Sequence, residues 1–146
     1  MREILFRGKR EDGIWFEGSL HKYTIQKPLK TETRYRIQEF NFGYSDENEF
    51  ECDYMSGFDE EVIPKTVGQF TGLYDVNGKK IYEGDIVKDI YGRIESCYYN
   101  QVRYCLIFQG VNYIRELVFA CESEYEVIGN IHDNPELLEE KENERD

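Results

Sequence analysis

The chain has 146 residues, enough for one domain of ordinary size or for two small lobes. Its formal net charge of −12 disfavours generic binding to nucleic-acid phosphates and to anionic membrane surfaces, because both would be repelled. Aromatic residues make up 15% of the chain, and such side chains suit a pleated, half-buried surface. We therefore expect a mainly β protein without a membrane partner.

The four cysteines are Cys52, Cys97, Cys105 and Cys121, and they form no Cys-X-X-Cys pair and no zinc-like spacing with histidine. Three of them lie in apolar, strand-like runs, where a free cysteine behaves as a small hydrophobe. The start of the sequence lacks the apolar core of a signal peptide, and no run is long enough to cross a membrane. We expect reduced thiols in the cytoplasm, with no metal and no cofactor.

The first elements expected in chain order form an N-terminal β-hairpin. The runs at residues 2–8 and 14–21 are short and rich in apolar side chains. Asp12-Gly13 between them is typical of a hairpin turn, because glycine accepts a positive φ at little cost. Trp15 lies in the second run, where a buried structural role is the ordinary expectation for this residue type.

The next segment is predicted to be extended and then acidic. Residues 22–45 favour a strand around Tyr35 and Ile37. The acidic stretch at 45–61 is expected to be a solvated loop or an edge region, and it lacks the glycine and spacing of a calcium-binding loop. Residues 1–61 are therefore expected to form an N-terminal hairpin and mixed β subdomain.

From residue 62 onward the pattern becomes more regular. Asn77-Gly78 predicts a two-residue turn of type I′, with strand-like runs before and after it. Five short strands at close spacing, with glycine at their ends, favour a small barrel that hides its edges. We expect residues 62–138 to form this barrel together with a C-terminal helical turn.

The end of the chain carries the signals of a helix start. Asn134 is a good N-cap, Pro135 fits the first helical position, and Glu136 favours the positive end of the helix dipole. Residues 139–146 have no apolar face. An acidic, disordered tail is the expectation for this last segment.

Three stretches together resemble one known family. They read FRGKREDGIWFEGSL at residues 6–20, VGQFTGLYDVNGKKIYEGDIV at 67–87 and YEVIGNIHDNPELL at 125–138. By these runs the chain is similar to the YopX family, found in phages and prophages of Gram-positive bacteria. The resemblance implies an SH3-type β-barrel in the C-terminal part and a mixed, β-containing N-terminal part. It implies no catalytic residue, because the biochemical role of the family is uncharacterised.

The strongest candidates for chemistry are Glu83 and Asp85. Residues two apart on a strand point to the same face, so the two could form an acid–base pair or bind a metal together with Asp75. Alternatively, the aspartate bonds nearby backbone amides and fixes the turn that enters a barrel strand. We favour this structural interpretation. The fold-signature residues are accordingly Gly72, Asn77, Gly78, Glu83, Gly84, Asp85, Asn134 and Pro135.

A hydrolase triad is the other enzymatic hypothesis. Ser96 or Cys97 would have to act with His132, and no nucleophile motif surrounds either residue. We therefore predict that the protein is not an enzyme and that it has no catalytic and no metal-ligating residues.

Basic residues gather between positions 22 and 36 and alternate there with aromatic ones. Such a segment can line a groove for single-stranded nucleic acid, or it can be a solvated strand face that offsets acidic neighbours. The second interpretation is favoured. Small barrels most often serve as docking surfaces through exposed aromatic side chains. The candidate interaction surface comprises Trp15, Phe16, Tyr23, Arg34, Tyr35, Arg36 and Phe40.

The sequence thus predicts a non-enzymatic interaction protein that acts on a host or phage protein. A nucleic-acid-associated accessory protein is the alternative, and a metal-dependent enzyme is the third hypothesis. Because an aromatic-rich lobe exposes more apolar surface than a monomer usually does, we also expect a homo-oligomer held by apolar burial.

Overall fold

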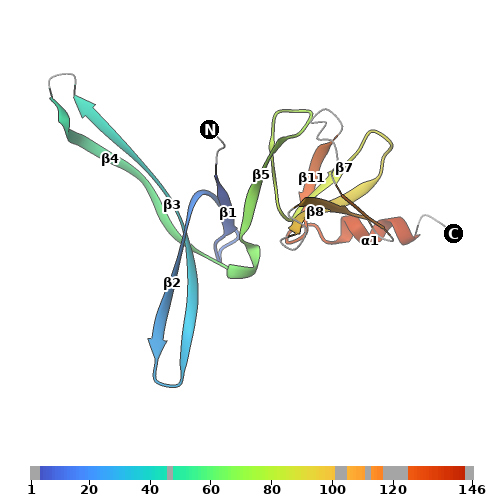
Figure 1. Ribbon diagram of the computed structural model, residues 1–146, viewed down its shortest axis with the longest axis horizontal. Helices are drawn as coiled ribbons and strands as arrows, with labels where there is room; N and C mark the ends of the chain where they lie inside the picture. The colour runs from blue at the N-terminus through green and yellow to red at the C-terminus, as the bar shows by residue number, and fades with distance from the viewer. Residues whose placement is uncertain (1–3, 46–47, 101–104, 111–112, 117–124, 144–146) are drawn as a thin grey trace. The chain divides into compact units, whose positions relative to one another are not determined.

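The computed structural model describes residues 4–45, 48–100, 105–110, 113–116 and 125–143 (Figure 1). The chain divides into two compact units, an N-terminal unit, Ile4–Val67, and a C-terminal unit that begins at Gly68. Strands dominate both units, and all strand pairs in them are antiparallel. The expectation of a mainly β protein is confirmed.

The four strands of the N-terminal unit lie in the order β4-β3-β2-β1. The hairpin expected around Asp12-Gly13 is present, because β1 pairs with β2 from Phe6↔Gly18 to Lys9↔Trp15. A single turn of 3₁₀ helix follows the last strand. The elements are β1 (Phe6–Lys9), β2 (Trp15–Lys27), β3 (Lys30–Ser45), β4 (Asn48–Val62) and η1 (Pro64–Thr66).

The long strand β3 changes partners along its length. It pairs with β2 from Lys30 to Gln38 and with β4 from Tyr35 to Ser45, so both neighbours are present only where these ranges overlap. Beyond the overlap each end of β3 belongs to a two-stranded ribbon (Figure 1). We call the ribbon formed by residues 21–34 the β2–β3 arm. The acidic stretch, expected to be a loop or an edge, is largely the edge strand β4.

The core of the N-terminal unit lies where the four strands meet. Ile37 is fully buried, and Phe16 packs on Phe58 with ring centroids 5.0 Å apart. Gly8 lies so close to Val62 that a Cβ at this position would come within 2.6 Å of the valine Cγ2. This close approach allows only glycine, because a larger residue would have to displace a buried side chain.

The C-terminal unit contains a hairpin, a five-stranded sheet and a helix. The sheet has the order β10-β9-β8-β7-β11, so the last strand returns to pair with the first. Among the described residues its edge strands β10 and β11 do not pair, and the closed barrel expected from the sequence is not present there. The elements are β5 (Gly68–Tyr74), β6 (Lys80–Tyr82), β7 (Asp85–Lys88), β8 (Ile94–Asn100), β9 (Cys105–Gln109), β10 (Ile114–Glu116), β11 (Glu126–Asn130) and α1 (Glu136–Asn143).

The core of this unit is a cluster of buried apolar side chains from several strands. The rings of Phe108 and Tyr125 stack with centroids 4.7 Å apart, and both residues are almost completely buried. Ile81, Val87 and Cys97 complete the cluster. Cys97 is a buried cysteine outside any disulfide, while the side chains of Cys52, Cys105 and Cys121 lie outside the described residues.

The turn at Asn77-Gly78 differs from the type I′ turn expected. The amide of Gly78 donates to the carbonyl of Asp75 at 3.0 Å, and the amide of Asp75 donates to the carbonyl of Lys79 at 2.7 Å. The loop therefore has three residues, with Gly78 at φ 80° after the turn rather than inside it. This is the arrangement of a type I turn followed by a glycine bulge.

The C-terminal helix starts as predicted but extends further. It begins directly after Pro135 and continues to Asn143, into the segment expected to be a disordered tail. The side-chain oxygen of Asn134 accepts a hydrogen bond from the amide of Asn130 at 3.3 Å, so it holds the end of β11 against the helix start. In the described part of the chain, no helix is long and apolar enough to cross a membrane.

Candidate functional site

The carboxylate of Asp75 in the C-terminal unit serves the backbone. Its Oδ1 accepts hydrogen bonds from the amides of Asn77 at 2.9 Å and Lys79 at 2.8 Å, and its Oδ2 accepts one from Val127 at 3.0 Å. Burial alone would raise the pKa of Asp75, but these three amides together hold the pKa below its usual value. Asp75 therefore fixes a turn and ties it to β11.

A second turn repeats this arrangement at Asp89. Its Oδ1 accepts hydrogen bonds from the amides of Tyr91 and Arg93, both at 2.9 Å, and its Oδ2 accepts one from Nε of Arg93 at 2.5 Å. Burial opposes ionisation here too, yet these donors lower the pKa of Asp89. The sequences DVNGK and DIYGR thus build the same kind of loop twice.

The two central carboxylates of the fold signature have different surroundings. Oδ2 of the fully buried Asp85 accepts a hydrogen bond from the amide of Tyr82 at 2.8 Å, across a turn that contains Gly84 at φ 89°. Partial burial raises the pKa of Glu83, against the opposing effect of hydrogen bonds from the backbone of Tyr99 and Gln69. Another signature glycine, Gly72, has a φ of 87° where β5 and β6 lose register.

The described residues do not assemble the candidate metal site, and they bury the thiol proposed for the triad. No group of three or more metal-ligating side chains is found among them, so Asp75, Glu83 and Asp85 do not converge on one ion. Cys97 is buried and its Sγ lies 3.1 Å from the carbonyl of Tyr82, to which the thiol donates. A thiol held in this way is not accessible to a substrate.

The open groove of the N-terminal unit is a more promising surface. Its volume is about 660 Å³, and β3, β4 and the first hairpin loop contribute to its walls. Charged side chains of both signs alternate along it. The residues that line it include Arg10, Glu32, Arg34, Glu60, Glu61 and Pro64.

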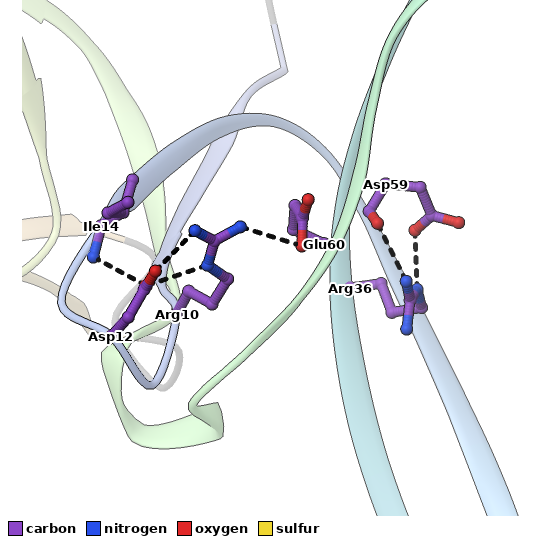
Figure 2. A network of polar contacts seen from close by, with 6 residues as sticks. All are labelled: Arg10, Asp12, Ile14, Arg36, Asp59 and Glu60. Carbon is purple, nitrogen blue, oxygen red and sulfur yellow. Dashed lines mark hydrogen bonds and ion pairs between the residues drawn. The ribbon is translucent and has the colours of Figure 1, made fainter.

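Arg10 is the most constrained cation of this groove (Figure 2). Its Nε donates to Oδ1 of Asp12 at 2.9 Å and its Nη2 donates to Oδ2 at 2.5 Å, while Nη1 lies 3.2 Å from Oε2 of Glu60. The guanidinium also lies 5.0 Å above the ring of Phe16. The hydrogen bond from Arg10 is the main cause of a lowered pKa of Asp12. The groove therefore presents an arginine whose orientation is fixed before any partner arrives.

Two further arginines of β3 are held by carboxylates of β4 and, for Arg34, also of β3 itself. Nε of Arg36 donates to Oδ1 of Asp59 at 2.7 Å, and Nη2 donates to the carbonyl oxygen of the same residue at 2.9 Å. Nε of Arg34 lies 3.2 Å from Oε1 of Glu32 and 3.5 Å from Oε1 of Glu61. Glu60 and Asp59 are adjacent on β4, and Figure 2 shows them on opposite sides of the β3–β4 ribbon. Such alternation is the normal direction of side chains along a strand.

The residues expected to form an interaction surface are only partly brought together. Tyr23 lies opposite Arg34 on β3, and Arg36 lies opposite His21, whose ring stacks on Tyr23. Tyr35 follows on the other face of the strand. Trp15 and Phe16 lie nearer the start of β2, where Phe16 packs on Phe58, and the side chain of Phe40 lies outside the described residues.

The sequence did not indicate which acids pair with these cations. Arg10 lies in the first hairpin loop and Arg36 on β3, whereas Glu60 and Asp59 lie on β4, which is distant in the sequence. The signal that could have found them is the combination of a basic strand and an acidic strand of similar length, since such strands compensate each other when they are neighbours.

These observations define a mainly β protein of two units with a charged groove and, among its described residues, no group of three or more metal-ligating side chains. The YopX family model, described as YopX protein, matches residues 5–139, and the chain belongs to the YopX family. The crystal structure of protein EF1440 from Enterococcus faecalis is similar, with a TM-score of 0.48 and 22% sequence identity, covering 94% of this chain and 99% of that one. No curated protein matches the chain.

Proposed function

We propose that the protein is a non-enzymatic docking protein whose charged groove receives a segment of another protein. The observation that carries this proposal is the fixed orientation of Arg10 between Asp12, Glu60 and Phe16. Arginine side chains are enriched at protein interfaces, and a side chain that is already held loses less entropy on binding. The groove therefore suits recognition better than chemistry.

A protein partner fits the electrostatics better than nucleic acid does. Binding to nucleic acid depends on cations that can neutralise phosphates. Arg10, Arg34 and Arg36 already have carboxylate partners, and Glu60 and Glu61 add negative charge to the same groove. A phosphate backbone would have to displace these carboxylates, whereas a polypeptide with both signs of charge would complement them.

We further propose that the C-terminal unit is a variant of the SH3-type fold and acts mainly as a scaffold. Supporting this proposal, β7 to β10 form a meander of consecutive strands, and β11 returns to pair with β7. The candidate partner is a host or phage protein in the bacterial cytoplasm, a context suggested by the family resemblance. The proposal assigns no reaction to either unit.

Site-specific photo-crosslinking in bacterial lysate tests the docking surface. A photoreactive residue replaces Glu61 in the groove in one variant and the exposed Lys88 of the C-terminal unit in a matched control. We expect a protein adduct of defined mass at position 61 that is absent at position 88. A nuclease-sensitive adduct would favour the nucleic-acid alternative, and equal labelling at both positions would contradict docking in the groove.

A further inference from the structure

The β2–β3 arm has an uncovered edge on its β2 side. On that side β1 pairs with β2 only between Trp15 and Gly18, while β3 occupies the opposite side along the whole arm. Residues 21–27 thus form a strand edge with no strand beside it in the described part of the chain. Figure 1 shows this hairpin projecting beyond the other strands of its unit. Uncovered edges of this kind are templates for pairing with another strand.

The register determines which backbone groups face outward from this edge. Lys27 and Lys30 flank a two-residue loop, so they form a hydrogen-bonded pair that closes the hairpin. Hydrogen-bonded and non-hydrogen-bonded pairs alternate along an antiparallel ladder. The amides and carbonyls of Lys22, Thr24 and Gln26 therefore point away from β3, toward a missing neighbour.

We propose that a second copy of this chain covers the edge, with β2 pairing antiparallel to β2 of the copy about a two-fold axis at Thr24. The free stretch 21–27 is centred on this residue, and its sequence HKYTIQK is self-complementary about it. The axis places Thr24 opposite Thr24, Tyr23 opposite Ile25 and Lys22 opposite Gln26. Aromatic pairs with β-branched residues and threonine pairs are among the favourable cross-strand contacts.

The charges on the two edges of the arm decide which edge takes the copy. With the axis at Thr24, no lysine of β2 lies opposite another lysine. The outer edge of β3 is also uncovered from Lys30 to Arg34, before β4 begins to pair. An axis at Glu32, the centre of this shorter stretch, would place Glu32 opposite Glu32 and Lys30 opposite Arg34, and like charges directly opposite each other are destabilising. An axis at Thr31 or at Thr33 would avoid these pairs, but it would leave only part of the uncovered stretch to pair, because β4 occupies this edge from Tyr35 onward. The β2 edge is therefore the one that is self-complementary over its whole uncovered length.

Pairing of the copies would also stabilise the arm itself. A two-stranded ribbon is marginally stable in water, whereas four strands in the order β3-β2-β2-β3 form a more stable sheet. The contacts consist of backbone hydrogen bonds and the pairs of Tyr23 with Ile25, so high salt should weaken the association little. This interface lies on the arm rather than at Trp15 and Phe16 of the candidate interaction surface.

The test compares Thr24→Pro with Thr33→Pro in the full chain. The two threonines lie opposite each other in a pair whose amides both point out of the hairpin, so neither proline removes a bond between β2 and β3. Light scattering should give the wild type about twice the protomer mass, or a multiple of it. We expect Thr24→Pro to reduce the mass by about half, while Thr33→Pro retains it. A monomeric wild type, or dissociation by Thr33→Pro alone, would overturn the proposal.

A crosslinking variant keeps the proposal testable if Thr24→Pro fails to fold. Directly opposite residues in a hydrogen-bonded antiparallel pair have Cα atoms about 5.5 Å apart, within the range that a disulfide spans. On mild oxidation, Thr24→Cys should give a disulfide-linked dimer, and Thr33→Cys and the wild type should not. No dimer from Thr24→Cys would contradict the assigned axis. These results do not depend on the groove, so docking at Glu61 and self-pairing at Thr24 can fail separately.

Discussion

The carboxylates of the two units serve different ends, although their residue types are the same. In the C-terminal unit Asp75 and Asp89 are buried and accept hydrogen bonds from backbone amides of their own turns. In the N-terminal unit Asp12 and Asp59 are exposed and pair with arginine side chains. Buried carboxylates satisfied by amides hold a fold together, whereas exposed ion pairs contribute little stability and remain available to a partner.

The largest effect is expected from Asp75→Ala, which removes the acceptor of three backbone amides in two separate segments. Buried donors that lose a charged acceptor cost about 2–4 kcal/mol in the free energy of unfolding. Chemical denaturation followed by circular dichroism measures the change. Asp59→Ala is the matched control in the N-terminal unit, and its effect should be much smaller, because that carboxylate is exposed. Equal losses in the free energy of unfolding for both variants would contradict the difference between the buried and the exposed carboxylates.

Gly78→Val should have the next largest effect, about 1–2 kcal/mol of destabilisation. The φ of 80° is unfavourable for a β-branched residue. The expected loss is conformational, because nothing lies within 4 Å of a Cβ built at this position. Gly78→Asn is the control, since asparagine tolerates positive φ better and should recover part of the stability in thermal melts. Melting of Gly78→Val at the wild-type temperature would show that the loop does not require this conformation.

The buried carboxylates of the C-terminal unit should also make the free energy of unfolding depend on pH, and this effect should be smaller. The pKa values of Asp75 and Asp89 are lowered in the folded protein, so their stabilisation is present above the unfolded value of about 3.9. It is lost as the pH falls through the lower, folded values. The free energy of unfolding should therefore decrease below about pH 4, and Asp75→Asn with Asp89→Asn should flatten that decrease. If the free energy of unfolding of the double variant decreases with falling pH as steeply as that of the wild type, other groups cause the decrease.

The smallest expected change is a gain from Glu83→Gln. Burial raises the pKa of Glu83, so the folded state favours the protonated form and the ionised form is destabilising. Because the pKa of Glu83 is higher in the folded state, its contribution to stability is present at low pH and is lost as the pH rises through the folded pKa. Glu83→Gln should therefore melt slightly higher than the wild type at pH 7 and no higher at low pH. A lower melting temperature at pH 7 would mean that the charge itself contributes a needed contact.

Features with local causes were predictable from the sequence. The hairpin at Asp12-Gly13 and the helix start at Pro135 rest on turn and capping chemistry within a few residues. The structural interpretation of Asp85 also agrees with its short-range bond to Tyr82. The loop at Asn77-Gly78 was located correctly, but its type was wrong, because the strands on both sides determine which residues close it.

Features that depend on distant partners were not predictable. The sequence left open whether the acidic stretch is a loop or an edge, and it is mostly the edge strand β4 because β3 supplies its hydrogen-bonding partner. The helix α1 continues past Leu138 although its sequence has no apolar face. Arg36 was singled out as an interaction residue, yet Asp59, which lies 23 residues away, binds its guanidinium. No periodicity in one segment reports which segment will lie beside it.

The sequence by itself determined the family, the mainly β class and the positions of most turns. These depend on residue types that prefer extended backbone or positive φ wherever they occur. Only the tertiary structure decided what each carboxylate does. Asp75 stabilises the fold because the amide of Val127, 52 residues away, lies within hydrogen-bonding distance of it. Glu60 takes part in the groove because the fold brings it to 3.2 Å from the guanidinium of Arg10. An acidic side chain has the same chemistry in both units, and the donors that the fold brings to it determine its role.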